Sequence, residues 1–375
     1  MQYIWAVPHP TRRKVIQMLS LAPVMAALPA RAQRSRQTRN ILLVMSDGLR
    51  WQEVFHGADE ALMTKENGVS DAEPLRRDYW RDTAAARREA LMPFLWKVVG
   101  RQGQIFGNRT LGSEVSVANG MNFSYPGYSE TLCGFPDPRI DSNDKKLNPN
   151  VTVFEWLQRK PPYRNRVAAF GAWDVFPYIF NQERAGFPVN AGYDPLTVPP
   201  VSERIEMLNR MKAESRVWDD EAFDPFTFHT ALEYLKQHQP RLLFLSLGET
   251  DEWAHDGKYA AYLHSVRRVD QELEQLWNTA QSMPAYRGNT TLIFTCDHGR
   301  GEGPVDWRSH GKKIPDSKYI WMGFLGPDTP ALGERRDTPA LQQNQVAATL
   351  AGLLGEDYKA AVPTAGEPIA AVLGK

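Results

Sequence analysis

The sequence has few cysteines, no net charge and few long apolar runs, and each of these deficits either excludes a class of protein or removes an argument for one. Its 375 residues contain two cysteines, Cys133 and Cys296, neither in a zinc-binding spacing. This excludes a disulfide-dense scaffold and leaves at most one disulfide. Basic and acidic residues number 44 each, so net charge gives no indication of binding to nucleic acid or an anionic membrane. No later apolar run is long enough to span a bilayer.

The N-terminal segment has the pattern of an export signal. Residues 11–14 (Thr-Arg-Arg-Lys) precede a mildly apolar stretch that ends in Ala-Arg-Ala at 30–32, an order typical of a cleaved signal. The paired arginines resemble the twin-arginine signal. We therefore expect residues 1–32 to engage the twin-arginine export machinery, and the mature protein to be periplasmic or secreted without a membrane anchor. An ordinary Sec signal, or a basic helix kept in the fold, is the alternative.

Short apolar segments predict the strands of a buried sheet. Residues 40–47, 241–248 and 290–297 are continuously apolar, as in strands covered on both faces of a parallel sheet, and residues 167–170 are a further candidate. An amphipathic stripe over residues 260–277 predicts a long helix, and residues 91–99 predict another. This alternation indicates an α/β fold with a mostly parallel central sheet and helices on both faces.

Two polar segments interrupt this alternation. Residues 55–89 and 173–221 are aromatic and punctuated by proline or glycine. We expect both to be cap-like insertions at the sheet's edge, within a single domain of residues 33–375 rather than as separate domains.

Each of the three longest apolar segments leads into an aspartate: Asp47, Asp251 or Asp297. Ligands of open α/β sheets bind beyond the carboxyl ends of the strands. Three carboxylates gathered there would repel one another unless cations lay between them. Taken singly, each aspartate also fits a turn or a helix cap.

Histidines accompany these aspartates. His255 follows Asp251 by four residues, which places both on one face of a helical turn, while His298 follows Asp297 directly and His310 lies in a short loop. Carboxylate and imidazole ligands without thiolate suit Zn²⁺ or Mn²⁺. The clustering therefore favours a metal site over isolated structural histidines.

Ser124 is the candidate nucleophile. Pro126 favours the first turn of a helix, which would place Ser124 at the helix N-terminus. Backbone N–H groups without partners there favour an anion or an ionised hydroxyl. An ordinary serine N-cap is the alternative.

Taken in order, these motifs resemble those of the alkaline phosphatase superfamily. The motifs are Ser-Asp47-Gly, Ser124-Tyr-Pro, Asp251-xxx-His255, Thr-Cys-Asp297-His298-Gly and the later His310. These motifs are most similar to those of the nucleotide pyrophosphatase/phosphodiesterase and phosphoglycerate-mutase-like branches, with sulfatases as further relatives. The resemblance implies an alkaline-phosphatase-like fold and two divalent metal ions, zinc or manganese.

The resemblance also implies roles for these residues. One ion would be held by Asp251, His255 and His310, and the second by Asp47, Asp297 and His298, with Ser124 bridging toward the second. Two such ions clamp the attacking and leaving oxygens of an in-line displacement. Ser124 would form a covalent phospho-serine that water then hydrolyses.

Substrate recognition is less constrained by the motifs. Sulfatases of this superfamily carry arginine two residues after the motif proline, where this chain has Tyr128, so we expect Ser124 to act as serine rather than as a formylglycine precursor. Candidate substrate-binding residues are Asn143, Arg300 and Lys312, and the charges of Arg300 and Lys312 also fit a solvated surface. Asn148 and Asn150 are alternatives to Asn143.

The leading hypothesis is an exported hydrolase of small phosphate esters, either a phosphodiesterase or a phosphomonoesterase. A sulfatase or phosphonate hydrolase of the same superfamily is the alternative among enzymes. A periplasmic metal-binding protein without turnover is the alternative outside them.

Overall fold

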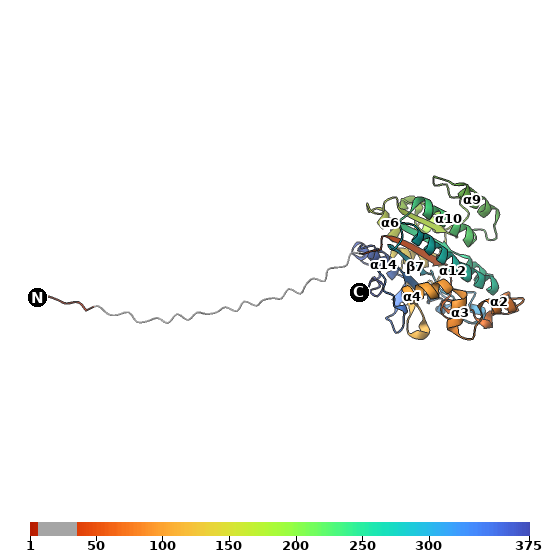
Figure 1. The fold of residues 1–375 in the computed structure, drawn as a ribbon, viewed down its shortest axis with the longest axis horizontal. Coiled ribbons are helices and arrows are strands. Elements are labelled where there is room, and N and C mark those ends of the chain that lie inside the picture. The colour runs from red at the N-terminus through yellow and green to blue at the C-terminus, as the bar shows by residue number, and fades with distance from the viewer. Residues whose placement is uncertain (7–35) are drawn as a thin grey trace. The chain divides into compact units, whose positions relative to one another are not determined.

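The computed structural model describes residues 1–6 and 36–375 (Figure 1). The chain divides into two units, Met1–Ser35 and Arg36–Lys375. Apart from residues 1–6, the predicted export signal at residues 1–32 lies outside the described residues. Within the described residues, no helix combines the length and apolar character needed to cross a membrane.

An eight-stranded sheet forms the centre of the larger unit, in the order β5-β4-β6-β1-β7-β8-β2-β9. In that order the strands are Val189–Ala191, Val167–Gly171, Leu242–Leu247, Asn40–Ser46, Thr290–Thr295, Met322–Leu325, Gln104–Phe106 and Gly333–Glu334. All neighbours pair in parallel except β8, which is antiparallel to both β7 and β2. The predicted mostly parallel sheet is confirmed. A separate pair joins β3 (Val115–Ser116) to β10 (Leu341–Gln342).

Fifteen α-helices, α1 to α15, surround the sheet in the described residues. Their bounds are Trp51–His56, Glu73–Tyr79, Ala84–Leu91, Gly100–Gln102, Ser124–Cys133, Val153–Gln158, Phe176–Ile179, Gln182–Ala185, Glu203–Glu214, Asp224–His238, Glu249–His255, Tyr259–Ser282, Gly303–Asp306, Gln345–Leu353 and Tyr358–Ala361. Short 3-10 turns occupy Glu60–Leu62, Lys65–Asn67, Arg109–Leu111 and Pro315–Lys318, and a π turn occupies Leu95–Val99.

Helices cover both faces of the sheet. Phe170 of β4 and Phe244 of β6 occupy neighbouring register positions, because Phe244 pairs with Ala169. Their side chains therefore point to opposite faces. The ring of Phe244 contacts Phe154 of α6, with centroids 6.1 Å apart, while Phe170 contacts Tyr234 of α10 at 5.2 Å. Because β1, β6 and β7 are buried along their whole length, they read as continuous apolar runs in the sequence.

The structure refines the predicted elements. The four predicted strands correspond to β1, β4, β6 and β7, and the predicted helix over residues 260–277 is the longer α12. The predicted helix over residues 91–99 is wrong in its first turn, because α3 ends at Leu91 and Met92 leaves the helical conformation (φ −128°, ψ 67°). Proline disfavours the helical conformation in the residue before it, and Pro93 follows Met92.

The segment of residues 173–221 contributes to the sheet as well as to its edge. It contains α7, α8 and α9 together with β5, which extends the sheet beyond β4. The segment of residues 55–89 folds into α2, most of α3 and short turns. That both are insertions in a single domain of residues 33–375 stays a prediction.

Helix α5 lies directly on the carboxyl end of the sheet. All ten of its residues are buried, and a Cβ added at Gly127 would overlap the backbone carbonyl oxygen of Asp297. Only a residue without a side chain permits this approach. Cys133 at the end of α5 and Cys296 after β7 are both buried free thiols.

Candidate active site

Three neighbouring strands deliver the predicted acidic residues to one edge of the sheet. Asp47 follows β1 directly, Asp297 lies two residues after β7, and Asp251 lies in the first turn of α11 after β6. Because β1 pairs with β6 on one side and β7 on the other, the three carboxylates converge. The sheet order thus explains the clustering.

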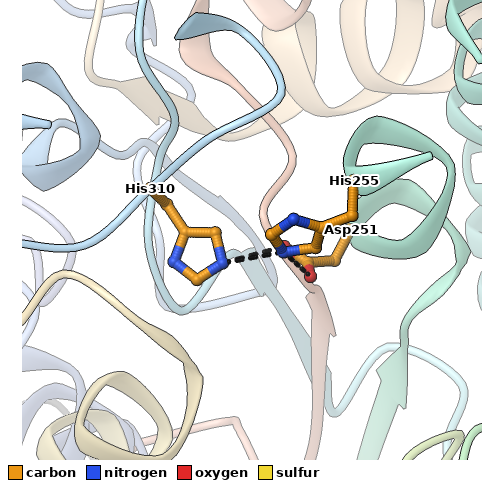
Figure 2. A group of neighbouring side chains, drawn as sticks. All are labelled: Asp251, His255 and His310. Atoms are coloured by element: carbon orange, nitrogen blue, oxygen red, sulfur yellow. Dashed lines mark hydrogen bonds and ion pairs between the residues drawn. The ribbon is translucent and has the colours of Figure 1, made fainter. Parts of the chain in front are cut away.

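The first ligand group consists of Asp251, His255 and His310 (Figure 2). His255 Nε2 lies 3.0 Å from Asp251 Oδ2 and 2.9 Å from His310 Nε2. The four-residue spacing within α11 brings Asp251 and His255 together, whereas His310 comes from the loop after α13. The three side chains therefore present their ligand atoms to one point.

The second ligand group consists of Asp47, Asp297 and His298, all buried. His298 Nε2 lies 3.3 Å from both Asp47 Oδ1 and Asp297 Oδ2. The same nitrogen lies 3.7 Å from Asp251 Oδ1, which connects the two groups. Ser124 Oγ is 3.3 Å from His298 Nε2, so the predicted nucleophile borders the second group.

The second group fits a divalent cation. Asp47 Oδ1 and Asp297 Oδ2 are buried and have no hydrogen-bond partner among the described residues. Burial, followed by the charge of Asp251, raises the pKa of Asp47 well above its usual range. Burial, followed by the charge of Asp47, also raises the pKa of Asp297 well above its usual range. Buried carboxylates of like charge are costly unless a cation compensates them, and this carboxylate–imidazole set suits Zn²⁺ or Mn²⁺.

Two histidines are held in the tautomer that a metal ligand requires. Nδ1 of His298 lies 2.9 Å from the carbonyl of Gly299, and Nδ1 of His310 lies 3.2 Å from that of Asn122. A carbonyl only accepts, so each Nδ1 donates and each Nε2 presents its lone pair to the site. Burial, and next His298, lower the pKa of His310 to about 2, which keeps its ring neutral.

Arg300 governs the charge state of the first group. Its guanidinium pairs with Asp251 Oδ1 and donates to the backbone carbonyl of Asp251 at 3.0 Å. Burial alone would raise the pKa of Asp251, but Arg300 and then His255 outweigh burial and hold that pKa well below its usual range. Asp251 therefore stays ionised as a ligand must.

Tyr128 holds Asp47 in place. Its hydroxyl lies 2.9 Å from Asp47 Oδ2, to which it donates, and 2.7 Å from Ser246 Oγ. This contact occupies one oxygen of the carboxylate and leaves Oδ1 facing His298. The residue that replaces the sulfatase arginine thus contacts a metal-ligand candidate.

Ser124 is the first residue of α5 and does not cap it. The N-cap is Phe123, and no side chain caps this helix, so the interpretation of Ser124 as an ordinary N-cap is wrong. Asn143 Oδ1 accepts the N–H of Tyr125 at 3.0 Å. The NH₂ group of Asn143 is then the part of this amide left to meet a substrate.

The predicted substrate-binding residues occupy different surroundings. Asn143 lines a cavity of about 290 Å³ shared with Ser124, the three residues of the first ligand group and Asp47 of the second. Arg300 is fully buried against Asp251 and the carbonyl of Arg308. Lys312 is exposed and does not line that cavity.

The cavity has further lining residues that the sequence motifs did not indicate. They are Lys145, Trp173, Val175, Asp220, Glu221 and Glu252. Most belong to or border the segment of residues 173–221, where no periodic pattern indicated a site. Trp253 packs on Trp218, and Trp307 is fully buried against Tyr259, so neither forms a wall of this cavity.

Comparison with known proteins agrees with this site and fold. Residues 39–355 match the Sulfatase family model. GPI ethanolamine phosphate transferase 1 of Homo sapiens is 23% identical over 299 residues, 79% of this chain and 26% of the relative. The 2,3-bisphosphoglycerate-independent phosphoglycerate mutase of Gracilaria tenuistipitata var. liui is 23% identical over 108 residues, 29% of this chain and 20% of the relative. The chain thus spans a fifth to a quarter of the length of these relatives.

Solved structures share the fold at low sequence identity. Wild-type alkaline phosphatase PafA has a TM-score of 0.60 at 10% identity, covering 90% of this chain and 99% of its own. The lipoteichoic acid synthase LtaP from Listeria monocytogenes has a TM-score of 0.55 at 11% identity, and the match covers 87% of this chain and 74% of LtaP. BT1596, a 2-O GAG sulfatase, has a TM-score of 0.54 at 15% identity, and the match covers 90% of this chain and 74% of BT1596. The predicted alkaline-phosphatase-like fold is confirmed.

We predict that His255→Ala lowers the metal content from two ions to one per chain, because it removes one ligand of the first group and leaves the second intact. Inductively coupled plasma mass spectrometry measures the content. Removing both ions should also lower the thermal midpoint, since a ligand present at a hundredfold its Kd stabilises the fold by about 2.7 kcal/mol. His264→Ala is the control, because His264 of α12 pairs with Tyr79 of α2 and belongs to neither ligand group. Two ions retained in His255→Ala would contradict the assignment.

We predict that Tyr128→Phe weakens metal binding by about 10- to 100-fold, the usual effect of removing a hydrogen bond to a metal ligand. Titration of the stripped protein with Zn²⁺ measures the affinity. Tyr125→Phe is a matched control in the same helix, since its hydroxyl donates to the carbonyl of Lys146 and touches no ligand. Equal affinities in the two variants would show that Tyr128 does not position Asp47.

Proposed function

The chain belongs to the Sulfatase family within the alkaline phosphatase superfamily, and we propose that it hydrolyses phosphate esters through a covalent phospho-serine on Ser124. Members of this superfamily are hydrolases and transferases that act on sulfate or phosphate esters. The observation that carries the proposal is the position of Ser124 Oγ, 3.3 Å from His298 Nε2 beside two ligand groups in one cavity.

The proposed reaction has two displacements at phosphorus. Ser124 Oγ, having lost its proton, attacks phosphorus, and the bond to the leaving ester oxygen breaks so that the alcohol departs with a proton. Water later cleaves the phospho-serine, which restores the serine hydroxyl and releases inorganic phosphate from a monoester or a phosphate monoester from a diester. Two divalent ions, when bound, supply positive charge that keeps the serine ionised and neutralises the leaving oxygen. The NH₂ group of Asn143 is placed to donate to an oxygen of the phosphoryl group.

Residue 128 and the relatives support phosphate over sulfate. Tyr128 stands where a sulfatase needs arginine, and its hydroxyl is engaged by Asp47 and Ser246. The names of the curated relatives refer to phosphoglycerate and ethanolamine phosphate. Serine therefore acts as an oxygen nucleophile in this proposal.

A sulfatase is the second candidate within enzymes. The match of residues 39–355 to the Sulfatase family model favours it, and sulfate has the shape of phosphate. A metal-binding protein without turnover is the candidate outside enzymes. The metal-binding protein differs from the phosphoesterase and the sulfatase because its function would not require Ser124 as a nucleophile.

We predict that Ser124→Ala lowers turnover by at least about a thousandfold, because no other group replaces a lost nucleophile. An aryl phosphate monoester, diester and sulfate are assayed side by side, and a burst of nitrophenol reports the phospho-enzyme. Ser129→Ala, in the same helix and bonded to Asn148, should retain activity.

Each outcome of this assay separates the candidates. Turnover of the sulfate alone would favour the sulfatase, and no turnover of any ester by the metal-loaded protein would favour the binding protein. Equal activity in Ser124→Ala and the unmodified chain would exclude Ser124 as the nucleophile.

We also propose that the protein is exported through the twin-arginine machinery to the periplasm or beyond. The support is the sequence pattern of residues 11–32. We predict that replacing both Arg12 and Arg13 with lysine traps the full-length precursor inside the cell, as measured by fractionation and immunoblotting. Normal export of this variant would favour a Sec signal.

A further inference from the structure

The loop that precedes α5 connects the proposed nucleophile to the first ligand group. Residues 117–123 run from the end of β3 to Phe123, the N-cap of the helix that begins with Ser124. The same loop contacts the chain around His310, because the carbonyl of Asn122 accepts a hydrogen bond from His310 Nδ1 at 3.2 Å. One turn of the backbone therefore borders both the proposed nucleophile and a candidate metal ligand.

This turn has a backbone conformation that few residue types accommodate. Asn122 has a φ of 56°, in the left-handed region that most residues with a side chain avoid. Asparagine is among the few that tolerate it, and glycine adopts it without strain. Phe123 returns to an extended conformation, with φ −148° and ψ 174°. The direction of the Asn122 carbonyl, and hence of the His310 ring, depends on the conformation of this one residue.

Asn119 holds the turn from within the loop. Its side-chain Oδ1 accepts the N–H of Met121 at 2.8 Å and the N–H of Asn122 at 3.1 Å. Side chains of this type often supply the hydrogen bonds that a loop backbone cannot make with itself. The tip of the loop is Gly120, which is exposed, and a Cβ added there would meet nothing within 4 Å. The loop is thus held by the hydrogen bonds of Asn119 rather than by packing at its tip.

Glu130 holds the loop against the helix that carries Ser124. Its carboxylate accepts the N–H of Ala118 at 2.9 and 3.0 Å, the N–H of Asn119 at 2.9 Å and the side-chain amide of Asn119 at 2.8 Å. Glu130 is fully buried, so the N–H groups of the loop compensate a carboxylate that would otherwise be costly to bury. The loop is therefore closed onto α5 by a residue that has no part in the proposed reaction.

We propose that the turn at Asn122, held by Asn119 and Glu130, positions His310 and Ser124 together and so couples the first ligand group to the nucleophile. Asn119, Asn122 and Glu130 are positioning residues, because they belong to neither ligand group and do not line the cavity. This inference rests on the proposed phosphoesterase function and names the part of the chain that aligns its nucleophile with its first ligand group.

The first test compares two substitutions of Asn122 that differ by one methyl group. Asn122→Gly leaves the left-handed conformation available, whereas Asn122→Ala places a Cβ where that conformation is strained. We expect Asn122→Ala to bind one of two Zn²⁺ ions about tenfold or more weakly, the usual effect of disturbing the partner of a metal-ligating histidine. Asn122→Gly should recover most of this affinity. Isothermal titration of the stripped protein with Zn²⁺ measures both binding steps.

Asn165 provides a matched control for the strain itself. It also has a left-handed backbone, with a φ of 60°, but it precedes β4 and so lies at the amino ends of the parallel strands, away from the ligand groups. Asn165→Ala and Asn165→Gly should therefore differ in thermal midpoint and not in zinc affinity. A loss of zinc affinity in Asn165→Ala as large as that in Asn122→Ala would attribute the effect to general destabilisation and overturn the proposal.

A double variant assigns the weakened ion to the first ligand group. His255→Ala already removes a ligand of that group, so adding Asn122→Ala should leave the affinity for the remaining ion unchanged. A further loss of about tenfold in the double variant would contradict the route through His310. Asn119→Ala, at a half-buried position, removes the acceptor that holds the turn and should weaken the same ion as Asn122→Ala. Unchanged affinity in Asn119→Ala would exclude Asn119 as a positioning residue.

The rate of phospho-enzyme formation tests the link to Ser124. At Zn²⁺ concentrations that fill both ligand groups, Asn122→Ala should still form phospho-enzyme about tenfold or more slowly than Asn122→Gly, because a small displacement of a reacting group is costly. Full recovery of the burst rate by excess zinc would overturn the coupling. Equal zinc affinities of the two Asn122 variants would show that the turn does not position His310. Hydrolysis of no ester by the unmodified, metal-loaded protein would instead show that the proposed function fails.

Discussion

The repulsion among three buried carboxylates is the constraint on which the rest of the site depends. Asp47, Asp251 and Asp297 converge at the ends of three adjacent strands, where burial makes uncompensated charge costly. Each is held through one oxygen: Asp47 by the hydroxyl of Tyr128, Asp297 by the N–H of Gly48 and Asp251 by Arg300. The second oxygen of each faces a histidine. Such one-sided support orients ligands toward a cation and leaves the residual charge for the cation to neutralise.

The fold serves this arrangement through strand order. Because β1 lies between β6 and β7, residues more than 200 positions apart in the chain end at the same edge. Helix α5 can approach that edge because Gly127 has no side chain to meet the carbonyl of Asp297. Ser124 therefore reaches His298 from the start of a fully buried helix, and this hydroxyl, the proposed nucleophile, is positioned by packing rather than by a flexible loop.

The sequence predicted those parts of the site that local patterns encode. Continuous apolar runs predicted β1, β6 and β7, and the aspartates that follow them could be placed at one edge because parallel strands share their carboxyl ends. The pairing of Arg300 with Asp251 could not be predicted, since it joins residues 49 positions apart without any periodic signal. The break at Met92 was readable from Pro93 in principle, but the apolar pattern of residues 91–99 concealed it. Residues 173–221 offered no periodicity, so their contribution of β5 and of Glu221 emerged only from the structure.

The residues at the strand ends and the residues of the 173–221 segment form different parts of the cavity, and this separation has a functional consequence. Residues expected to perform chemistry lie on strand ends and on α5 and α11, where burial and sheet register fix them. Residues that line the rest of the cavity, such as Trp173 and Glu221, lie where the segment after β4 is joined by a short backbone bridge. Among the described residues, neither Asp47 nor Asp297 takes a hydrogen bond from that segment, so a change there alters the shape and charge of the cavity without removing a hydrogen bond from either of these two carboxylates. Proteins named as a mutase, a transferase and a sulfatase are similar to this chain in sequence or in fold. Ligand candidates fixed at the sheet edge, with the other cavity residues on a different segment, are a physical arrangement that permits such diversity.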